Sequence, residues 1–414
     1  MEEHAVVTCF LRHGTEVLVV RRSEAVGSYR GQWGGISGFT EGRPDEAARW
    51  EIDEEAGLLD AVEEVRSADP VPVEDDQRGT RWLVHPYLFD CNSTDVTLNE
   101  ELADHEWVQP PEILRRETVP KLWEAYTAVA PSVESVRSDT EHGSAYISLR
   151  ALEVLRDGAA VAAEGGEGDY DTLAALARDL RDARPSMGAV SNRINRVMAT
   201  AEATPESVLE AATEACERAV DADAEAAETA ARRLGERVLT LSRSGTVLDA
   251  LREVAPEAVY VAESRPAREG VGVAEQLAEA GIDATLFVDA AVADVIDRED
   301  VETVLFGADA VLADGTVVNK VGSHPAALAA DAADADCYAV CSRDKIVSGT
   351  ALDREPGPAA AVYDGDADVA VLNPTFEGVP SDLVDGVVTE DGVLSTDGVA
   401  AVAEEHAELA DWNG

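Results

Sequence analysis

The stretch FGADAVLADGTVVNKVGSHPAALAA, residues 306–330, carries the pattern of a buried strand, a tight turn, a second strand and a helix. A glycine closes the first apolar run, and Asp309 follows it, where a carboxylate can meet a ligand at the edge of a sheet. An Asp-Gly pair, typical of tight turns, precedes Asn319 and Lys320. A lone aspartate at the end of a strand is more often structural than catalytic, so it is the whole pattern that indicates a ligand site.

Strand and helix patterns alternate along the rest of the C-terminal half. Apolar, β-rich runs recur at residues 237–242, 258–264, 284–289, 303–315 and 337–342. Helical segments such as VAEQLAEAG, residues 273–281, separate several of these runs. Such alternation predicts a doubly wound parallel sheet, in which ligands bind at the carboxyl ends of the strands.

The pattern divides the chain into three parts, consistent with its length. Residues 1–130 mix short apolar strands with a helical segment and predict a mixed α+β domain. Residues 131–235 are helical, and residues 236–414 carry the alternating pattern of a Rossmann-like domain. The predicted fold class is therefore α/β, with a mixed N-terminal domain, a helical subdomain and a parallel sheet.

Acidic residues dominate the composition. The 414 residues carry a formal net charge of -50, from 83 acidic against 33 basic residues. The only lysines are Lys121, Lys320 and Lys345. A chain with 45% hydrophobic residues, a carboxylate-rich surface and few lysines is typical of extreme halophiles, where multimolar salt screens the repulsion. Acidic runs therefore carry little information here, whereas each lysine carries more than usual.

The sequence also restricts where this protein works. No stretch approaches the ~18–20 apolar residues that span a bilayer, and the N-terminal residues lack the basic region of a secretion signal. The five cysteines are scattered and form no CxxC pair, so we expect buried, reduced thiols. These features predict a cytoplasmic protein without a membrane partner, and the negative charge opposes direct binding of nucleic acid.

The stretch WEIDEEAGL, residues 50–58, places acidic side chains at helical spacing. Glu51, Glu54 and Glu55 lie at i, i+3 and i+4, so a helix brings their carboxylates onto one face, within about 5–6 Å of each other. Their repulsion is unfavourable unless something compensates it, and magnesium, which binds carboxylate oxygens, is the obvious candidate. Gly57 suits the C-cap of this helix. The alternative is an acidic helix in an acidic protein.

The longer stretch GGISGFTEGRPDEAARWEIDEEAGL, residues 34–58, resembles a Nudix box, whose helix carries Glu-x-x-Glu-Glu. The resemblance extends over about residues 5–125. It implies hydrolysis of a nucleoside diphosphate linked to another group, by a metal-activated water, with Glu51 and Glu54 as catalytic residues. The ligands that it implies for magnesium, with manganese as the alternative ion, are Glu51, Glu54, Glu55 and Glu41.

Two features depart from the Nudix pattern. Trp50 stands where the family carries an arginine, and Arg49 lies one step earlier, about 100° around the helix. The first half of the motif is irregular, because the spacing from Glu41 to Glu51 is one residue longer than in the family. A retained Nudix fold that serves binding or assembly is therefore the alternative to a working metal site.

The C-terminal half resembles the family that unites the regulatory subunits of translation initiation factor two-B with sugar-phosphate isomerases. Those isomerases act on ribose-1,5-bisphosphate and methylthioribose-1-phosphate. After residues 306–330, the stretches that carry the resemblance are ARPSMGAVSNRINRVM (183–198), RVLTLSRSGTVLDAL (237–251), VYVAESRPAREG (259–270) and CYAVCSRDKI (337–346). The resemblance covers about residues 132–405 and implies a homo-oligomer formed through this module.

The SRSGT stretch, residues 242–246, connects a strand to a helix with small residues. Backbone N–H groups and hydroxyls in such a turn can hold a phosphate at the helix N-terminus, and nearby cations can add charge-assisted contacts. The predicted phosphate-binding residues are Arg243, Ser244, Gly245, Arg265, Asn319, Lys320 and Lys345. The alternatives are ordinary turn chemistry for this stretch and structural ion pairs for the arginines.

The isomerases of this family use a cysteine and an aspartate. In the resemblance the aspartate position is Asp309, whereas the cysteine position falls on Ser242, and both are candidate catalytic residues. A serine is a far poorer acid than a cysteine, whose pKa is about 8.5. The glycine-rich phosphate loop of the isomerases is represented only by EHGSA, residues 141–145. These changes favour recognition of a sugar phosphate or nucleotide without isomerisation.

Three functions remain. The first is a magnesium-dependent Nudix-type hydrolase of a nucleoside-diphosphate-linked substrate, fused to a module that binds a phosphorylated sugar or nucleotide. The second is a regulatory or assembly protein like initiation factor two-B, with a non-catalytic Nudix domain. The third is an aldose-ketose isomerase of the ribose-1,5-bisphosphate type. The intact acidic triad on residues 50–58 favours the first.

Overall fold

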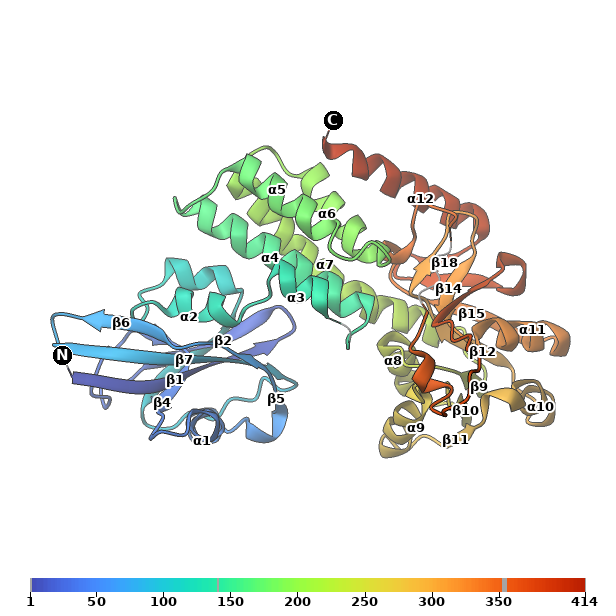
Figure 1. Ribbon diagram of the computed structural model, residues 1–414, viewed down its shortest axis with the longest axis horizontal. Helices are drawn as coiled ribbons and strands as arrows, with labels where there is room; N and C mark the ends of the chain where they lie inside the picture. Colours follow the sequence, from blue (N-terminus) through green and yellow to red (C-terminus); the bar gives the residue numbers. More distant parts are fainter. Residues whose placement is uncertain (1, 140, 352–355, 414) are drawn as a thin grey trace. The chain divides into compact units, whose positions relative to one another are not determined.

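The computed structural model describes residues 2–139, 141–351 and 356–413 (Figure 1). The chain divides into two compact units. The first comprises Met1–Ser135, Arg150–Ala175 and Glu202–Cys216, and the second comprises Val136–Leu149, Leu176–Ala201 and Glu217–Gly414. The helices that contribute residues to both units are α3 (Val133–Ser138), α4 (Ser144–Ala163), α5 (Tyr170–Arg181) and α7 (Pro205–Ala231).

A mixed sheet of eight strands forms the centre of the first unit. Its strands are β1 (Glu2–His13), β2 (Glu16–Arg22), β3 (Trp33–Gly34), β4 (Ile36–Phe39), β5 (Val62–Ser67), β6 (Val71–Asp75), β7 (Thr80–Cys91) and β8 (Leu102–Val108). The main path runs β3-β2-β1-β7-β5, while β4 pairs with β1, β6 with β7 and β8 with β2. β1 and β7 are parallel, and the other pairs are antiparallel.

Two helices cover opposite faces of this sheet (Figure 1). Helix α1 (Pro44–Ala56) buries Ile52 in one apolar cluster together with Cys9 of β1. Helix α2 (Leu122–Val129) belongs to the cluster on the other face, which contains Phe10 of the same strand. Successive side chains of a strand point to opposite faces, so β1 contributes to both cores.

Buried charged side chains join this sheet to the middle of α4. The Glu153 side chain is 1% exposed, and its Oε2 lies 3.0 Å from Arg150 Nη1 and 3.9 Å from Arg12 Nη1 of β1. Arg156, one turn further along α4, is fully buried and pairs with Asp157 at 2.8 Å. Buried charges are costly unless they are paired, so these contacts hold this part of α4 in the first unit.

A seven-stranded sheet forms the centre of the second unit. Its strands, in spatial order, are β11 (Ala284–Phe287), β10 (Ala258–Ala262), β9 (Arg237–Thr240), β12 (Thr303–Gly307), β15 (Asp336–Val340), β17 (Gly386–Thr389) and β18 (Gly392–Leu394). Neighbouring strands are parallel except for the hairpin of β17 and β18. This is the doubly wound parallel sheet that the sequence predicts.

Helices cover both faces of the parallel sheet. On one face Leu305 of β12 packs with α8 (Gly245–Val254), α9 (Glu269–Glu279) and the C-terminal part of α7. On the other face the neighbouring Phe306 packs with α10 (Val292–Arg298), α11 (Ser323–Ala333) and α12 (Thr396–Leu409). From Val304 to Gly307 strand β12 is therefore continuously apolar, as expected for a strand buried on both sides.

Smaller elements complete the described chain. A second, antiparallel sheet contains β13 (Ala310–Val311), β14 (Val317–Lys320) and β16 (Phe376–Val379). The remaining described α-helix is α6 (Gly188–Thr200). The 3-10 helices are η1 (Leu59–Ala61), η2 (Pro110–Arg115), η3 (Asp289–Ala291), η4 (Arg343–Lys345), η5 (Ala359–Ala361), η6 (Ser381–Leu383) and η7 (Ala410–Asn413).

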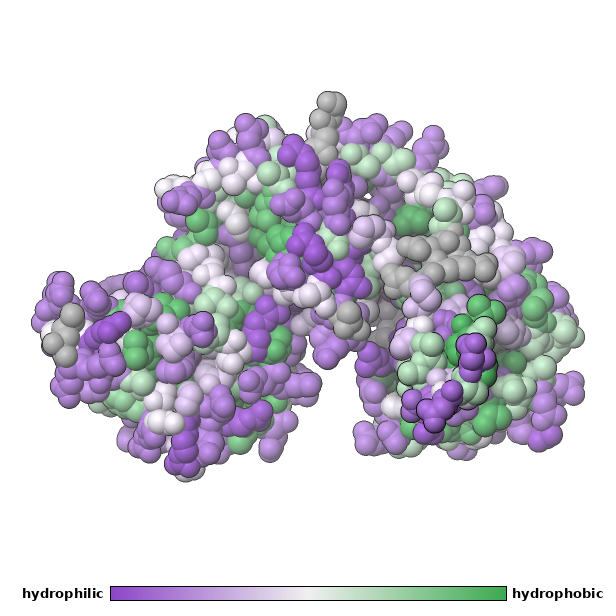
Figure 2. All heavy atoms as spheres, viewed as in Figure 1, coloured by the Kyte–Doolittle hydropathy of each residue, from purple (hydrophilic) through white to green (hydrophobic). Residues whose placement is uncertain are grey.

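The hydrophilic surface and the buried cysteines are consistent with what the amino-acid composition predicts. Figure 2 shows hydrophilic residues over most of the visible face, with smaller apolar patches between them. All five cysteines fall within the described residues, and each is buried and free of a disulfide. Among the described helices, none combines the length and the apolar character required to cross a bilayer.

The buried charges on α4 predict a large loss of stability when one partner is neutralised. Glu153→Gln removes the carboxylate that Arg150 and Arg12 share, while Arg12 keeps its 2.7 Å ion pair with Asp90. We expect it to lower the free energy of unfolding by about 2–3 kcal/mol. Glu112→Gln removes the exposed partner of Arg115 and serves as the control, with an expected loss below about 1 kcal/mol. Chemical denaturation of the full chain measures both, and equal losses would contradict the prediction.

Candidate functional sites

Helix α1 begins and ends as its sequence predicts. Pro44 occupies its first position, where the missing N–H costs nothing, and Asp45 lies in the first turn, where the helix dipole favours negative charge. Gly57 follows the helix with φ 68° and donates its N–H to the Asp53 carbonyl at 3.1 Å. The predicted glycine C-cap is confirmed.

The same helix buries a carboxyl group beside its apolar face. Ile52 and Ala56 pack on the sheet, and Glu55 lies on their side of the helix, where it is only 2% exposed. The backbone N–H of Ser37, in β4, donates a hydrogen bond of 2.9 Å to Glu55 Oε2. Glu55 therefore connects the helix to the strand that precedes it.

A cavity of about 290 Å³ opens beside this helix. We call it the carboxylate cavity, because Glu51, Glu54 and Glu101 line it. The cation on its wall is Arg22, which donates a 3.2 Å hydrogen bond to the Ser37 hydroxyl. The cavity thus places several carboxylates and one guanidinium around a space that a small ligand can enter.

Gly38 gives the Glu51 side chain its place in the carboxylate cavity. A Cβ atom at position 38 would lie 1.6 Å from Glu51 Oε1. Because the obstacle is the end of a flexible side chain, an alanine there would displace the carboxylate rather than unfold the strand. The glycine of β4 is therefore a requirement of the acidic cluster.

Burial and mutual repulsion disfavour the ionised forms of two of these glutamates. Burial, followed by the charges of Glu54 and Glu101, raises the pKa of Glu51 to about 7. Burial also raises the pKa of Glu55 to about 8, with Glu51 adding to the rise, although the Ser37 hydrogen bond opposes it. The cavity has uncompensated negative charge, which a bound cation would reduce.

The glutamates of this site have the oxygen ligands that a hard divalent cation prefers, although their carboxylates are not grouped around one cation position. Carboxylate oxygens are the ligands that magnesium prefers. Glu54 instead accepts a 2.7 Å hydrogen bond from the indole N–H of Trp50, and Glu55 is engaged by Ser37. Within the described ranges, no three His, Cys, Asp or Glu side chains are grouped as metal ligands. A cation held by Glu51 and Glu54 requires Glu54 to turn from Trp50.

The structure separates the predicted residues of the first site. Glu51 and Glu54 line the carboxylate cavity, and Glu55 lies buried beside it. Glu41 is exposed on the turn before α1, with φ 46°, and is not among the residues that line the cavity. The sequence did not predict Glu101, because a single glutamate carries no signal in a chain this acidic.

A second cavity, of about 790 Å³, lies at the carboxyl ends of the strands of the parallel sheet. We call it the sheet-end cavity. The predicted residues that line it are Ser242, Arg243, Ser244, Gly245, Asp309, Asn319, Lys320 and Lys345. Those that follow β9, β12 and β15 are brought together by the doubly wound topology, whereas Asn319 and Lys320 lie in β14 of the second, antiparallel sheet. Arg265 is exposed and lies outside this cavity, and its backbone N–H binds Asp289 at 2.7 Å.

Ser242 and Ser244 have different surroundings in the sheet-end cavity. Ser244 is the N-cap of α8, and its side chain accepts a hydrogen bond from the Val247 N–H. Ser242 is 6% exposed, has φ 60°, and donates its hydroxyl proton to Glu269 Oε2 at 2.8 Å. Lys320 Nζ lies 3.4 Å from the other oxygen of Glu269. Glu269, which the sequence did not single out, is thus central to this wall.

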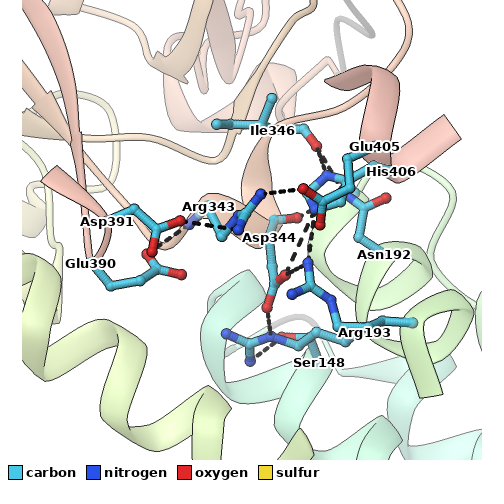
Figure 3. Close-up of polar contacts among 12 residues, drawn as sticks. Ser148, Asn192, Arg193, Arg343, Asp344, Ile346, Glu390, Asp391, Glu405 and His406 are labelled. Carbon is cyan, nitrogen blue, oxygen red and sulfur yellow. Dashed lines mark hydrogen bonds and ion pairs between the residues drawn. The ribbon is translucent and has the colours of Figure 1, made fainter. Parts of the chain in front are cut away.

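A buried ion cluster holds the loop that carries Lys345 (Figure 3). Asp344, in η4, accepts hydrogen bonds from Arg193 at 3.0 Å and from Arg196 at 2.9 Å, both on α6. Burial alone would raise the pKa of Asp344, but the two guanidinium groups outweigh it and hold the pKa below its usual value. Lys345 Nζ donates to the Ala308 carbonyl at 2.8 Å.

Side chains from α6 and α12 also fix this loop. Asn192 Nδ2 lies 2.8 Å from the carbonyl oxygens of both Asp344 and Ile346. His406 Nδ1 contacts the Ile346 carbonyl at 2.7 Å, and Arg343 binds Glu405 at 2.8 Å (Figure 3). The loop is therefore bound to two helices, which places Lys345 rigidly at the cavity.

The families that match this chain agree with both resemblances. The NUDIX domain family matches residues 2–129, and the initiation factor 2 subunit family matches residues 140–396. The chain belongs to the initiation factor 2 subunit family and carries an N-terminal NUDIX domain. The carboxylate cavity lies in the part matched by the first family, and the sheet-end cavity in the part matched by the second.

Curated relatives of the C-terminal part are named as isomerases. Ribose 1,5-bisphosphate isomerase of Haloferax volcanii is 32% identical over 284 residues, covering 64% of this chain and 87% of the relative. Methylthioribose-1-phosphate isomerase of Pseudomonas fluorescens (strain Pf0-1) is 30% identical over 321 residues, covering 68% and 88%. The chain thus spans most of the length of both relatives.

A solved structure has the same fold in this part. Translation initiation factor eIF-2B of Pyrococcus horikoshii gives a TM-score of 0.53 at 23% identity, covering 63% of this chain and 94% of that one. The 5-methylthioribose 1-phosphate isomerase of the same organism also gives 0.53, at 21% identity, covering 67% and 86%. The expected fold class is confirmed.

The raised pKa values predict that the first unit loses stability as the pH rises. Glu51 and Glu55 hold their protons up to about pH 7 and about pH 8 in the folded protein, against 4.5 as the ordinary value. Between these values the folded state binds more protons than the unfolded state, so the free energy of unfolding falls with increasing pH and levels off above about pH 8.

Thermal unfolding between about pH 5 and pH 8 measures this slope. Glu55→Gln removes the more deeply buried acid and should reduce the loss across this range by about 2–4 kcal/mol, at roughly 1.4 kcal/mol for each pKa unit. Asp53→Asn, exposed on the same helix, should leave the slope unchanged. A stability that increases from pH 5 to pH 8 would contradict the assignment.

Proposed function

We propose that the N-terminal domain hydrolyses a nucleoside-diphosphate-linked substrate with a divalent cation, magnesium or manganese, and that the C-terminal module binds a phosphorylated sugar. The observation that carries the first part is the carboxylate cavity. There Glu51, Glu54 and Glu101 face one space beside Arg22. A pyrophosphate between a cation and a guanidinium would neutralise both the acidic cluster and its own charge.

Aromatic side chains support a nucleoside as part of the substrate. Trp82, Phe39 and Tyr29 line the carboxylate cavity. The Trp82 ring centroid lies 6.2 Å from that of Phe39 and 6.4 Å from that of Tyr29. Phe39 is 57% exposed, so its ring is accessible to a flat partner. A base that stacks here places its phosphates toward the glutamates.

The residues of this domain have separate tasks in the proposed reaction. A bound divalent cation activates water and stabilises negative charge on phosphate oxygens. Glu51 and Glu54 hold the cation, and Glu55 fixes α1 against the Ser37 amide. Arg22 binds the phosphate that remains with the leaving group. Burial of Glu51, which raises its pKa to about 7, also suits it to exchange protons near neutral pH.

Replacing Glu51 tests the hydrolase. In high salt with magnesium, we expect Glu51→Gln to reduce the formation of nucleoside monophosphate and sugar phosphate from a panel of nucleotide sugars by at least about 100-fold, because it removes a charged ligand and a proton acceptor. Gly38→Ala should reduce it as well, since the new methyl group occupies the position of the Glu51 carboxylate. Asp53→Asn is the matched control on the same helix.

Two outcomes would contradict the hydrolase. One is cleavage of nucleotide sugars to nucleoside monophosphate that does not depend on a divalent cation. The other is full activity of Glu51→Gln, which would leave the Nudix domain as a binding appendage of a regulatory protein. In that case binding of a nucleotide sugar, measured by calorimetry, should persist in both variants.

The second part of the proposal depends on the sheet-end cavity. Arg243, Lys345 and the first turn of α8 supply positive charge and backbone N–H groups at one place. Relatives that are about 30% identical are named as isomerases of phosphorylated ribose compounds. Ser242 and Asp309 also line this cavity together, which keeps isomerisation as the second candidate function.

Arg243→Ala tests phosphate binding. A lost charge-assisted hydrogen bond is worth about 1.5–3 kcal/mol, so we expect the dissociation constant for ribose 5-phosphate to rise by roughly 10- to 100-fold. Arg252→Ala, on α8 but outside the cavity, should bind normally. Equal affinities of the two variants would contradict the assignment. Ketose formation that Asp309→Asn abolishes would establish the isomerase instead of a purely binding module.

A further inference from the structure

Both hydrogen-bond donors of Ser242 are already engaged within the protein. Its backbone N–H donates to Ser264 Oγ at 2.7 Å. Its hydroxyl lies 2.8 Å from Glu269 Oε2, and an ionised carboxylate can only accept, so the hydroxyl proton points to Glu269. The oxygen of Ser242 is therefore left with its lone pairs as the group that a ligand can meet.

Glu269 is held in place from three sides. It is the first residue of α9, where the helix dipole favours a carboxylate. Its second oxygen lies 3.4 Å from Lys320 Nζ, with which it forms an ion pair. The adjacent Gly270 allows the helix to approach β10 closely, because a Cβ there would lie 1.9 Å from the Ala262 carbonyl oxygen. Rotation of Glu269 away from Ser242 would break its contacts with the Ser242 hydroxyl and with Lys320, while the close approach of α9 to β10 fixes the backbone that carries it.

This arrangement has a consequence for what can bind beside Ser242. A phosphate oxygen needs a donor, and it would also lie close to the negative charge of Glu269. A ligand hydroxyl, in contrast, can donate its proton to Ser242 Oγ without any charge conflict. The wall formed by Ser242 and Glu269 therefore disfavours an anion and accepts a hydroxyl.

We propose that Ser242 and Glu269 form a hydroxyl-recognition subsite, with Glu269 as the residue that sets its specificity. The inference depends on the proposed binding of a sugar phosphate and divides the cavity into two ends. The phosphate lies at Arg243 and the N-terminus of α8, and a hydroxyl of the sugar lies at Ser242. Ser242, although it belongs to the SRSGT stretch, is thus not a phosphate ligand.

The test compares two probes, ribose 5-phosphate and inorganic phosphate, by calorimetry on the full chain. The wild-type protein should bind ribose 5-phosphate more tightly. In Glu269→Gln the amide can donate to Ser242, which frees the hydroxyl proton for an anion. We expect the preference for ribose 5-phosphate to fall by about 10-fold, the effect of one hydrogen bond, while inorganic phosphate binds as well as before or better. Ser242→Ala should lose the same preference.

A matched control separates this role from a structural one. Glu263→Gln neutralises a carboxylate that pairs with Arg268 outside the cavity and should leave the preference unchanged. If both probes bind but Glu269→Gln keeps the wild-type preference, the subsite is wrong while phosphate binding stands. If neither probe binds the wild-type protein, the proposed function fails and the subsite fails with it.

Discussion

The ion cluster around Asp344 is the interaction on which the geometry of the sheet-end cavity depends. Its carboxylate is buried and pairs with both Arg193 and Arg196, so loss of Asp344 would leave two guanidinium groups without their shared carboxylate. The cluster binds α6 to the loop after β15, and that loop delivers Lys345 to the carbonyl of Ala308. The ion pairs of Asp344 thereby fix the relative positions of α6 and of the loop that carries Lys345, and both contribute residues to the cavity wall.

The two cavities differ in whether their acidic groups are paired with cations. In the carboxylate cavity the protein gathers negative groups without enough cations, so Glu51 and Glu55 hold their protons to unusually high pH. In the sheet-end cavity every acidic group that the structure describes at Ser242 is matched, since Glu269 meets Lys320. The first arrangement is suited to a cation, and the second to a neutral hydroxyl beside an anion.

Much of this architecture follows from local rules that are visible in the sequence. Gly57 ends α1 because a left-handed C-cap favours glycine, and the apolar run at β12 is continuous because both of its faces are covered. The loops at the carboxyl ends of the strands bring Asp309 and Lys345 together, as a doubly wound sheet requires. These features depend on residue type and spacing alone.

Other features depend on contacts between distant segments, which no local pattern encodes. Glu101 and Glu269 resemble many other acidic residues of this chain, and only the folded structure sets them beside Glu51 and Ser242. The sequence also does not reveal that Arg265, in a stretch typical of the family, is exposed and does not line the cavity. Charge pairing across the fold decides these roles.

Because lysine is rare in this chain, the lysines of the sheet-end cavity are useful sites for chemical labelling. Two of the three ε-amines of the chain, those of Lys320 and Lys345, line this single space, while Lys121 is exposed in the first unit. Two of the three lysines that an amine-acylating reagent can modify therefore report on the cavity. Mass spectrometry of the modified peptides, with Lys121 as internal reference, would detect occupancy of the cavity as protection of Lys320 and Lys345 from acylation.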